Sequence, residues 1–271
     1  MTEFVRDMVQ GEHHAGAPWR GVDFSGLTVV LGVGTGRLIE VLARQAAASR
    51  GTLLVTETAR NRLDDLRSLR ESTPLTLALA RPPQVPVFSD TADLLVVNGI
   101  LREVPEQRLG VFFAEVWRAM VPGGRLRISD IIEPQDPERT AAWALRNDIV
   151  RKLARATEHP MAISVDLRRA ALVLQQVGFE NLNVALLPGY VLNDDWLEDT
   201  VNAIRNMAGR LVNRDLRAAI VQQDIPRLIS AYARGNQTAA ERFVLQGAKA
   251  GNLALDMNAS FTEEDLVDTE E

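Results

Sequence analysis

The stretch VVLGVGTGRL, residues 29–38, joins an apolar strand, three alternating glycines and the first turn of a helix. Because Gly32, Gly34 and Gly36 lack side chains, they can adopt positive φ angles and let a ligand approach the backbone closely. The helix that follows points its free N–H groups and the positive end of its dipole at the same turn. The sequence therefore predicts an α/β fold in which this turn binds a small polar or anionic group.

Strand signals recur along the chain, separated by helical periodicity or, after residue 80, by a proline-punctuated loop. The apolar runs that we interpret as strands cover residues 27–33, 51–57, 75–80, 92–99, 125–132, 181–188 and 241–251. This order predicts a Rossmann-like, seven-stranded, mainly parallel sheet, with helices on both faces and a helical insertion before the last strand. Ligands of such sheets bind at the carboxyl ends of the strands, where the glycine turn lies.

Composition divides the chain into three parts. We expect an N-terminal helical lid segment at residues 1–24, the main domain at 25–257 with a helical insertion at about 190–236, and an acidic, disordered tail at 258–271. The tail contains six acids and no base, so it carries the whole formal charge of −6 and leaves the rest of the chain neutral. A neutral body has no broad cationic face, which argues against nucleic acid as a partner.

Residue usage excludes further classes. The chain has no cysteine, which excludes disulfides, thiolate metal sites and a cysteine nucleophile, and its three histidines argue against a zinc site. The sequence has no apolar run of the roughly 18 residues that a spanning helix needs, and its first 25 residues lack the order of a signal peptide. We therefore expect a cytoplasmic protein that binds neither metal nor membrane.

Spacing within the glycine turn separates the nucleotide ligands. A dinucleotide fingerprint needs glycine or alanine at position 37, which is Arg37, and the lysine of a phosphate-binding P-loop is absent. These departures disfavour an NAD-linked oxidoreductase. Glu57 ends the next strand, 21 positions after Gly36, where a carboxylate can accept two hydrogen bonds from a ribose diol. The pattern predicts a ligand that contains a nucleoside.

The turn VVLGVGTGRL resembles the first motif of the class I S-adenosylmethionine-dependent methyltransferases. The segments LLVTETA and DTADLLVVNGILREVP resemble that family's second and fourth strands, and FFAEVWRAMVPGGRLRISDII is similar to the branch that includes quinone and arsenite methyltransferases. The resemblance covers residues 25–133. It implies S-adenosyl-L-methionine as cofactor, S-adenosyl-L-homocysteine as product and a small organic acceptor, with O- or C-methylation favoured. Arsenite is disfavoured, because those enzymes depend on cysteines.

The resemblance also implies a set of cofactor-binding residues. The backbone at residues 32–34 would pass under the amino acid part of the cofactor, Glu57 would bind the ribose, and the pair that ends the fourth strand would border the methionine end. The full predicted set is Gly32, Val33, Gly34, Thr35, Gly36, Glu57, Thr58, Arg81, Asn98 and Gly99.

Two positions depart from the family pattern, because Val30 and Arg81 stand where its members carry acids. A hydrogen bond to a charged group is worth about 1.5–3 kcal/mol, so losing two carboxylates would weaken cofactor binding. A catalytically degenerate protein that keeps the fold for a binding or structural role is therefore the alternative.

Methyl transfer from a sulfonium needs alignment of the nucleophile more than a catalytic side chain. If a general base takes part, the candidates are His13 and His14 in the lid segment and Asp130 at the end of the fifth strand. Their alternative roles are as surface residues for the histidines and as a loop brace for Asp130. Apolar residues spaced three and four apart between Leu197 and Leu211 form a stripe that packs either on its own domain or on a second subunit, and the second alternative predicts a homodimer through the C-terminal helices.

Overall fold

The computed structural model describes residues 22–34, 37–64, 66–70, 73–158 and 161–251. The predicted lid segment and acidic tail lie outside these residues, apart from residues 22–24 of the former. Within them, the strands are β1 (Leu27–Leu31), β2 (Thr52–Glu57), β3 (Leu75–Leu79), β4 (Ala92–Asn98), β5 (Met120–Ile131), β6 (Phe179–Leu187) and β7 (Arg242–Lys249).

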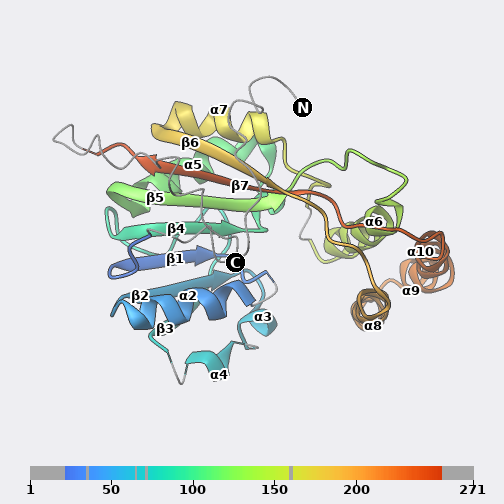
Figure 1. Cartoon of the computed structure of the whole chain (residues 1–271). Coiled ribbons are helices and arrows are strands. Elements are labelled where there is room, and N and C mark those ends of the chain that lie inside the picture. Colours follow the sequence, from blue (N-terminus) through green and yellow to red (C-terminus); the bar gives the residue numbers. More distant parts are fainter. Residues whose placement is uncertain (1–21, 35–36, 65, 71–72, 159–160, 252–271) are drawn as a thin grey trace, which may run out of the picture.

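These strands form one seven-stranded sheet in the order β3-β2-β1-β4-β5-β7-β6 (Figure 1). Strands β1 to β5 pair in parallel, whereas β7 is antiparallel to both β5 and β6. The chain reverses direction across the sheet between β1 and β4, which places the ends of these neighbouring strands at the switch point where ligands of such sheets bind. The predicted Rossmann-like fold is confirmed.

The helices are α2 (Arg37–Ala48), α3 (Arg60–Asp64), α4 (Arg67–Arg70), α5 (Leu109–Ala119), α6 (Ala141–Ala156), α7 (Leu167–Val177), α8 (Asp194–Gly209), α9 (Arg214–Ala219) and α10 (Ile225–Tyr232). Shorter turns are the 3-10 helices η2 (Leu101–Glu103) and η3 (Glu106–Arg108) and the π-helical η4 (Ile220–Asp224).

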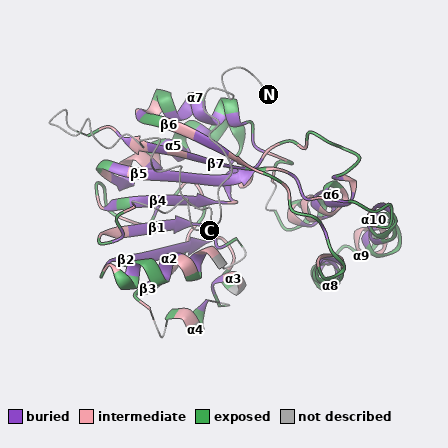
Figure 2. Cartoon of the chain, in the orientation of Figure 1, coloured by how far each residue is buried: buried purple, intermediate pink, exposed green. Residues whose placement is uncertain are grey.

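Both faces of the central strands are buried, which explains why β1 and β4 are apolar at nearly every position (Figure 2). Helix α2 covers one face, where Ile39 packs with Val30 of β1. Helices α5 and α7 cover the other, where Phe112 and Phe113 pack with Val29. Strand β1 is thereby held rigidly just before the glycine turn.

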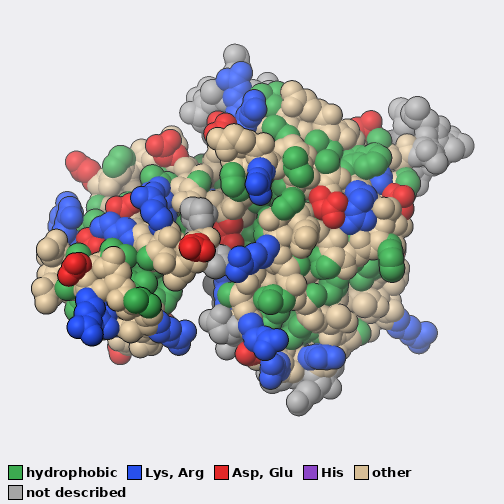
Figure 3. Space-filling model, turned by 180° about the vertical axis from the view of Figure 1, so that it is seen from behind, with side chains coloured by type: hydrophobic (Ala, Val, Ile, Leu, Met, Phe, Trp, Pro, Cys, Tyr) green, Lys and Arg blue, Asp and Glu red, His purple; other side chains and the backbone are tan. Residues whose placement is uncertain are grey.

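Helices α6, α8, α9, η4 and α10 form a separate helical group beyond the carboxyl ends of β1 and β4 (Figure 1). Except for α6, they occupy the predicted insertion between β6 and β7. Their core includes Val201, Ile204 and Leu211, three residues of the apolar stripe that predicted a dimer. Figure 3 shows a hollow between this group and the sheet domain.

The insertion consists of several helices and not one long helix, because polar side chains cap the start of α8 and of α9. The carboxamide of Asn193 accepts the backbone N–H of Trp196 at 2.9 Å and begins α8. Asn213 accepts the N–H of Leu216 at 3.0 Å and begins α9, four residues after α8 ends. The second cap turns one amphipathic stretch into helices that can pack on each other.

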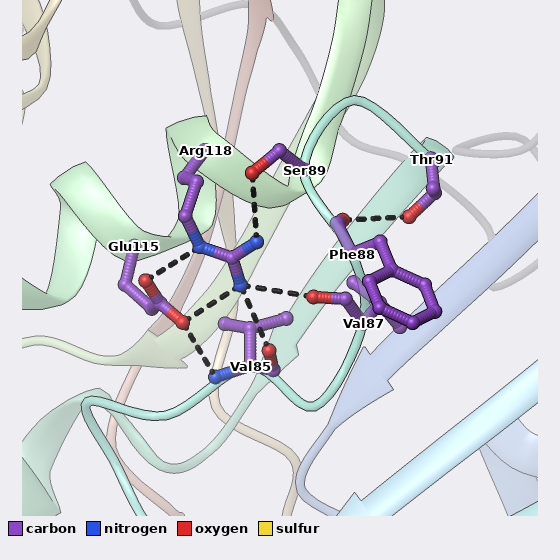
Figure 4. A network of polar contacts seen from close by, with 7 residues as sticks. All are labelled: Val85, Val87, Phe88, Ser89, Thr91, Glu115 and Arg118. Carbon is purple, nitrogen blue, oxygen red and sulfur yellow. Dashed lines mark hydrogen bonds and ion pairs between the residues drawn. The ribbon is translucent and has the colours of Figure 1, made fainter.

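The connection between β3 and β4, residues 80–91, is held against α5 by Arg118 (Figure 4). Its guanidinium donates to both carboxylate oxygens of Glu115 at 2.8 Å, to the Ser89 hydroxyl at 3.2 Å, and to the carbonyls of Val85 and Val87 at 3.1 and 3.0 Å. The hydrogen bonds from Arg118 hold the pKa of the Glu115 carboxyl below its usual value. This network fixes the connection that forms one wall of the site below.

Candidate functional site

The glycine turn follows β1 at the switch point of the sheet. Gly32 and Gly34 have φ angles of +93° and +60°. A Cβ atom at Gly32 would collide with the Asn98 carbonyl oxygen, and one at Gly34 with the Asn98 side-chain nitrogen. Glycine is therefore required at both positions by backbone conformation and by the close approach of Asn98. The predicted Thr35 and Gly36 lie outside the described residues.

The end of β4 forms the opposite side of the turn. The Asn98 carboxamide donates to the carbonyl of Gly32 at 3.5 Å, and the N–H of Gly99 donates to the carbonyl of Ser129 at 2.8 Å. Gly99 has a φ angle of +71°, and a Cβ added there would have no described atom within 4 Å. The backbone of Gly99 therefore borders open space among the described residues.

Glu57 lies beside the turn at the end of β2 and is only 2% exposed. Its Oε1 atom accepts the Thr58 N–H at 2.8 Å and the Thr58 hydroxyl at 3.0 Å. Its Oε2 atom accepts the Val33 N–H at 3.2 Å and lies 3.2 Å from Nη1 of Arg62. The fold thus brings six of the predicted cofactor residues together: Gly32, Val33, Gly34, Glu57, Thr58 and Asn98.

A small cavity opens between these strand ends and the connection that follows β3. Its volume is about 10 Å³, and Gly32, Glu57, Thr58 and Pro82 are among its lining residues. That volume holds about one water molecule, whereas small-molecule pockets measure roughly 300–1,000 Å³. A nucleoside would therefore need neighbouring side chains to move.

Arg81 lies in the same connection, but its side chain is exposed. Its carbonyl accepts the N–H of Gln84 at 2.9 Å, and its neighbours Ala80 and Pro82 line the cavity, whereas Arg81 does not. The segment therefore borders the cavity through Ala80, Pro82 and Gln84.

Asp130 is buried at the end of β5 and makes contacts of a different kind. It accepts the Nε–H of Arg102 at 2.8 Å, the backbone N–H of Arg102 at 3.4 Å and the N–H of Ile131 at 2.8 Å. Arg102 also donates to the carboxamide oxygen of Asn147 in α6 at 3.2 Å. Asp130 therefore connects β5 to η2 and, through Arg102, to the helical group. These contacts are those expected of a loop brace. His13 and His14 lie outside the described residues.

Sequence reasoning did not anticipate Arg62, Arg102 or Asn147. Arg62 carried the clearest signal, because it follows the ribose-type acid by five residues at the start of a helix. Arg102 and Asn147 are separated from their partners by 28 and 45 residues, so no local pattern marks them.

The described ranges contain neither a candidate metal site nor a membrane-spanning helix. In those ranges, no group of three or more histidine, aspartate or glutamate side chains could hold a metal ion. None of the described helices is long and apolar enough to cross a membrane.

Residues 29–128, from β1 into β5, match the family model described as a methyltransferase domain. Over these residues, the chain is similar to that family. The match covers the glycine turn, Glu57 and Asn98, and it confirms the predicted relationship to class I methyltransferases, with S-adenosyl-L-methionine as their cofactor. No curated protein sequence matches the chain.

Solved structures share the fold of the methyltransferase domain at low identity. The YcgJ protein of Bacillus subtilis is 13% identical, with a TM-score of 0.52 over 87% of this chain and 97% of its own. The cyclase SpnF is 14% identical, with a TM-score of 0.53 over 87% and 79%. Phosphoethanolamine N-methyltransferase 2 of Haemonchus contortus, solved with S-adenosyl-L-methionine, is 13% identical, with a TM-score of 0.50 over 86% and 50%. One of these proteins is a cyclase, so the fold alone does not fix the reaction.

Proposed function

We propose that the protein transfers the methyl group of S-adenosyl-L-methionine directly, in line, to a small organic acceptor, with oxygen or carbon favoured as the acceptor atom. The observation that carries this proposal is the buried Glu57 carboxylate beside the glycine turn, with Gly99 on the opposite side, where a Cβ would have no described atom within 4 Å. This set suits the cofactor, because the carboxylate can accept a ribose diol and the turn admits close backbone contact.

In this proposal, each part of the cofactor has its own residues. Backbone groups of Gly32, Val33 and Gly34, with Thr35 and Gly36, hold the amino acid part. Glu57 and Thr58 hold the ribose, Arg81 borders the adenine, and Asn98 and Gly99 border the methionine end.

The bound cofactor supplies an electrophilic methyl group on a sulfonium, so the protein needs chiefly to orient the acceptor and exclude water. The helical group lies beyond the carboxyl ends of β1 and β4 (Figure 1), and the hollow between it and the sheet domain (Figure 3) is the proposed acceptor side. His13 or His14 would serve as general base if one is needed. Asp130 would act by fixing the strand end and α6, because its oxygens already accept three N–H groups.

Calorimetric titration with S-adenosyl-L-methionine and S-adenosyl-L-homocysteine tests the cofactor site. We expect micromolar binding by the wild type. Glu57→Ala should weaken it about 10- to 150-fold, the loss of a hydrogen bond to a charged group. Gly34→Leu should abolish binding, and Glu40→Ala, an exposed acid of α2, should bind as the wild type does. No binding by the wild type at millimolar ligand would refute the proposal and favour the degenerate alternative.

The acceptor and the assembly need separate experiments. Transfer of a labelled methyl group to panels of phenols, activated carbon acids and amines tests the acceptor class, and methylation confined to amines would contradict it. The proposed location is cytoplasmic, and the proposed assembly is a homodimer through the C-terminal helices. Since Ile204 and Leu211 already pack within one chain, the dimer would use their exposed neighbours, such as Met207. A monomeric mass by light scattering would refute it.

A further inference from the structure

Arg62 bridges the two halves of the proposed cofactor site. Its Nη1 atom lies 3.2 Å from Oε2 of Glu57, and its Nη2 donates to the carbonyl of Gly34 at 3.1 Å. One guanidinium therefore spans from the acid that ends β2 to the turn that ends β1. The Arg62 side chain is 40% exposed, whereas that of Glu57 is fully buried.

The Glu57 carboxylate has no free acceptor position in this arrangement. A carboxylate offers about four lone-pair sites. The N–H and hydroxyl of Thr58, the N–H of Val33 and the guanidinium of Arg62 together make four contacts with it. A ribose hydroxyl can therefore donate to Glu57 only where a present partner leaves.

Arg62 is the partner that can leave with least cost. Two of the others are backbone N–H groups at the ends of β1 and β2, and the Thr58 hydroxyl comes from the adjacent residue. Arg62 comes from the five-residue helix α3, and its half-exposed cation can be solvated by water when it swings away. The cavity beside Glu57, with its volume of about 10 Å³, is consistent with a site that is closed in this state.

We propose that Arg62 is an affinity-determining latch of the cofactor site: its guanidinium holds Glu57 and the Gly34 carbonyl until a ribose diol replaces it on Glu57. This inference rests on the proposed function. The cofactor then competes with an internal cation, whereas a ligand without the two ribose hydroxyls leaves Arg62 on Glu57.

The experiment compares Arg62→Met with the wild type by titration with S-adenosyl-L-homocysteine. This probe carries no net charge, so removing a nearby cation does not change its affinity through simple Coulomb attraction. We expect Arg62→Met to bind about two- to fivefold more tightly, the range of a partly exposed ion pair. Arg62→Lys, which reaches only one of the two oxygens, should gain less. Arg67→Met is the matched control, because Arg67 pairs with the exposed Asp64 at 2.7 Å. The affinity of this variant for S-adenosyl-L-homocysteine should equal that of the wild type.

A second readout separates the latch from a structural role. Adenosine, used as a competitor, should gain affinity in Arg62→Met, whereas 2′,3′-dideoxyadenosine, which has neither ribose hydroxyl, should gain little. A thermal unfolding curve for each variant checks that it is folded, and if Arg62→Met does not fold, Arg62→Lys carries the comparison.

The outcomes are distinguishable from failure of the proposed function. Tighter binding by Arg62→Met, or binding by it alone, supports the latch. Wild-type binding with equal affinity in the variant overturns the latch and leaves the cofactor site standing. Weaker binding also overturns it, and would make Arg62 a direct cofactor ligand. If neither protein binds at millimolar ligand, the proposed cofactor site fails and the latch fails with it.

Discussion

Replacing Asp130 by alanine would leave the Arg102 guanidinium without its carboxylate inside the junction between β5, η2 and α6. The substitution removes the acceptor of three N–H groups: Nε–H and backbone N–H of Arg102, and the N–H of Ile131. The Asp130 side chain is 1% exposed and that of Arg102 is 14% exposed, so water can replace little of what is lost.

Breaking a buried ion pair by removing one partner costs about 3–5 kcal/mol. We expect about 3 kcal/mol here, because Arg102 keeps its hydrogen bond to Asn147 and some access to water. For a domain of this size, that loss lowers Tm by about 6–12 °C. Asp130→Asn keeps an acceptor oxygen of similar shape and should cost about 1–2 kcal/mol.

Thermal and urea unfolding measure this loss, and methyl-transfer rates at a temperature where all variants are folded measure function. Asp148→Ala is the control, since Asp148 pairs with Arg151 within α6 and is 56% exposed, and it should change stability by less than about 0.5 kcal/mol. Asp130→Ala within about 1 kcal/mol of the wild type would refute the brace. Loss of turnover in Asp130→Asn at unchanged stability would instead make Asp130 a catalytic residue.

Two further predictions concern the glycine turn and the wall of the site. Gly32→Ala should lose at least about 2 kcal/mol in urea unfolding, because its φ is +93° and its Cβ would meet the Asn98 carbonyl. Gly209→Ala, in open space at the end of a helix, should lose nothing, and equal losses would contradict this reasoning. Hydrogen bonds from Arg118 lower the pKa of the Glu115 carboxyl in the folded protein. The ionised carboxylate therefore stabilises the fold above the unfolded pKa near 4.5, and this stabilisation is lost as the pH falls through the pKa of the folded state. The stability gap between wild type and Glu115→Gln should therefore narrow from pH 7 to pH 3, and a constant gap would refute it.

Local sequence patterns are enough to predict the sheet, the glycine turn and the position of Glu57. These features are local: buried strands are continuous apolar runs, helices show their own periodicity, and the glycines and acid follow strands directly. A parallel sheet then brings the ends of β1, β2 and β4 to one edge, so Gly32, Glu57 and Asn98 meet without any further signal.

Tertiary structure alone decided what those residues contact. The position of Asp130 in the sequence allows either a catalytic group or a brace. In the fold, Arg102, 28 positions away, donates to the Asp130 carboxylate and also to Asn147, which lies 45 positions beyond Arg102. In the same way, only the packing of α3 shows that Arg62 contacts both the Glu57 carboxylate and the Gly34 carbonyl, so that all acceptor positions of Glu57 are occupied. The periodicity of apolar residues in the sequence predicts which face of a helix or strand is buried. Pairing between polar side chains depends instead on distances between elements, and these follow only from how the elements pack.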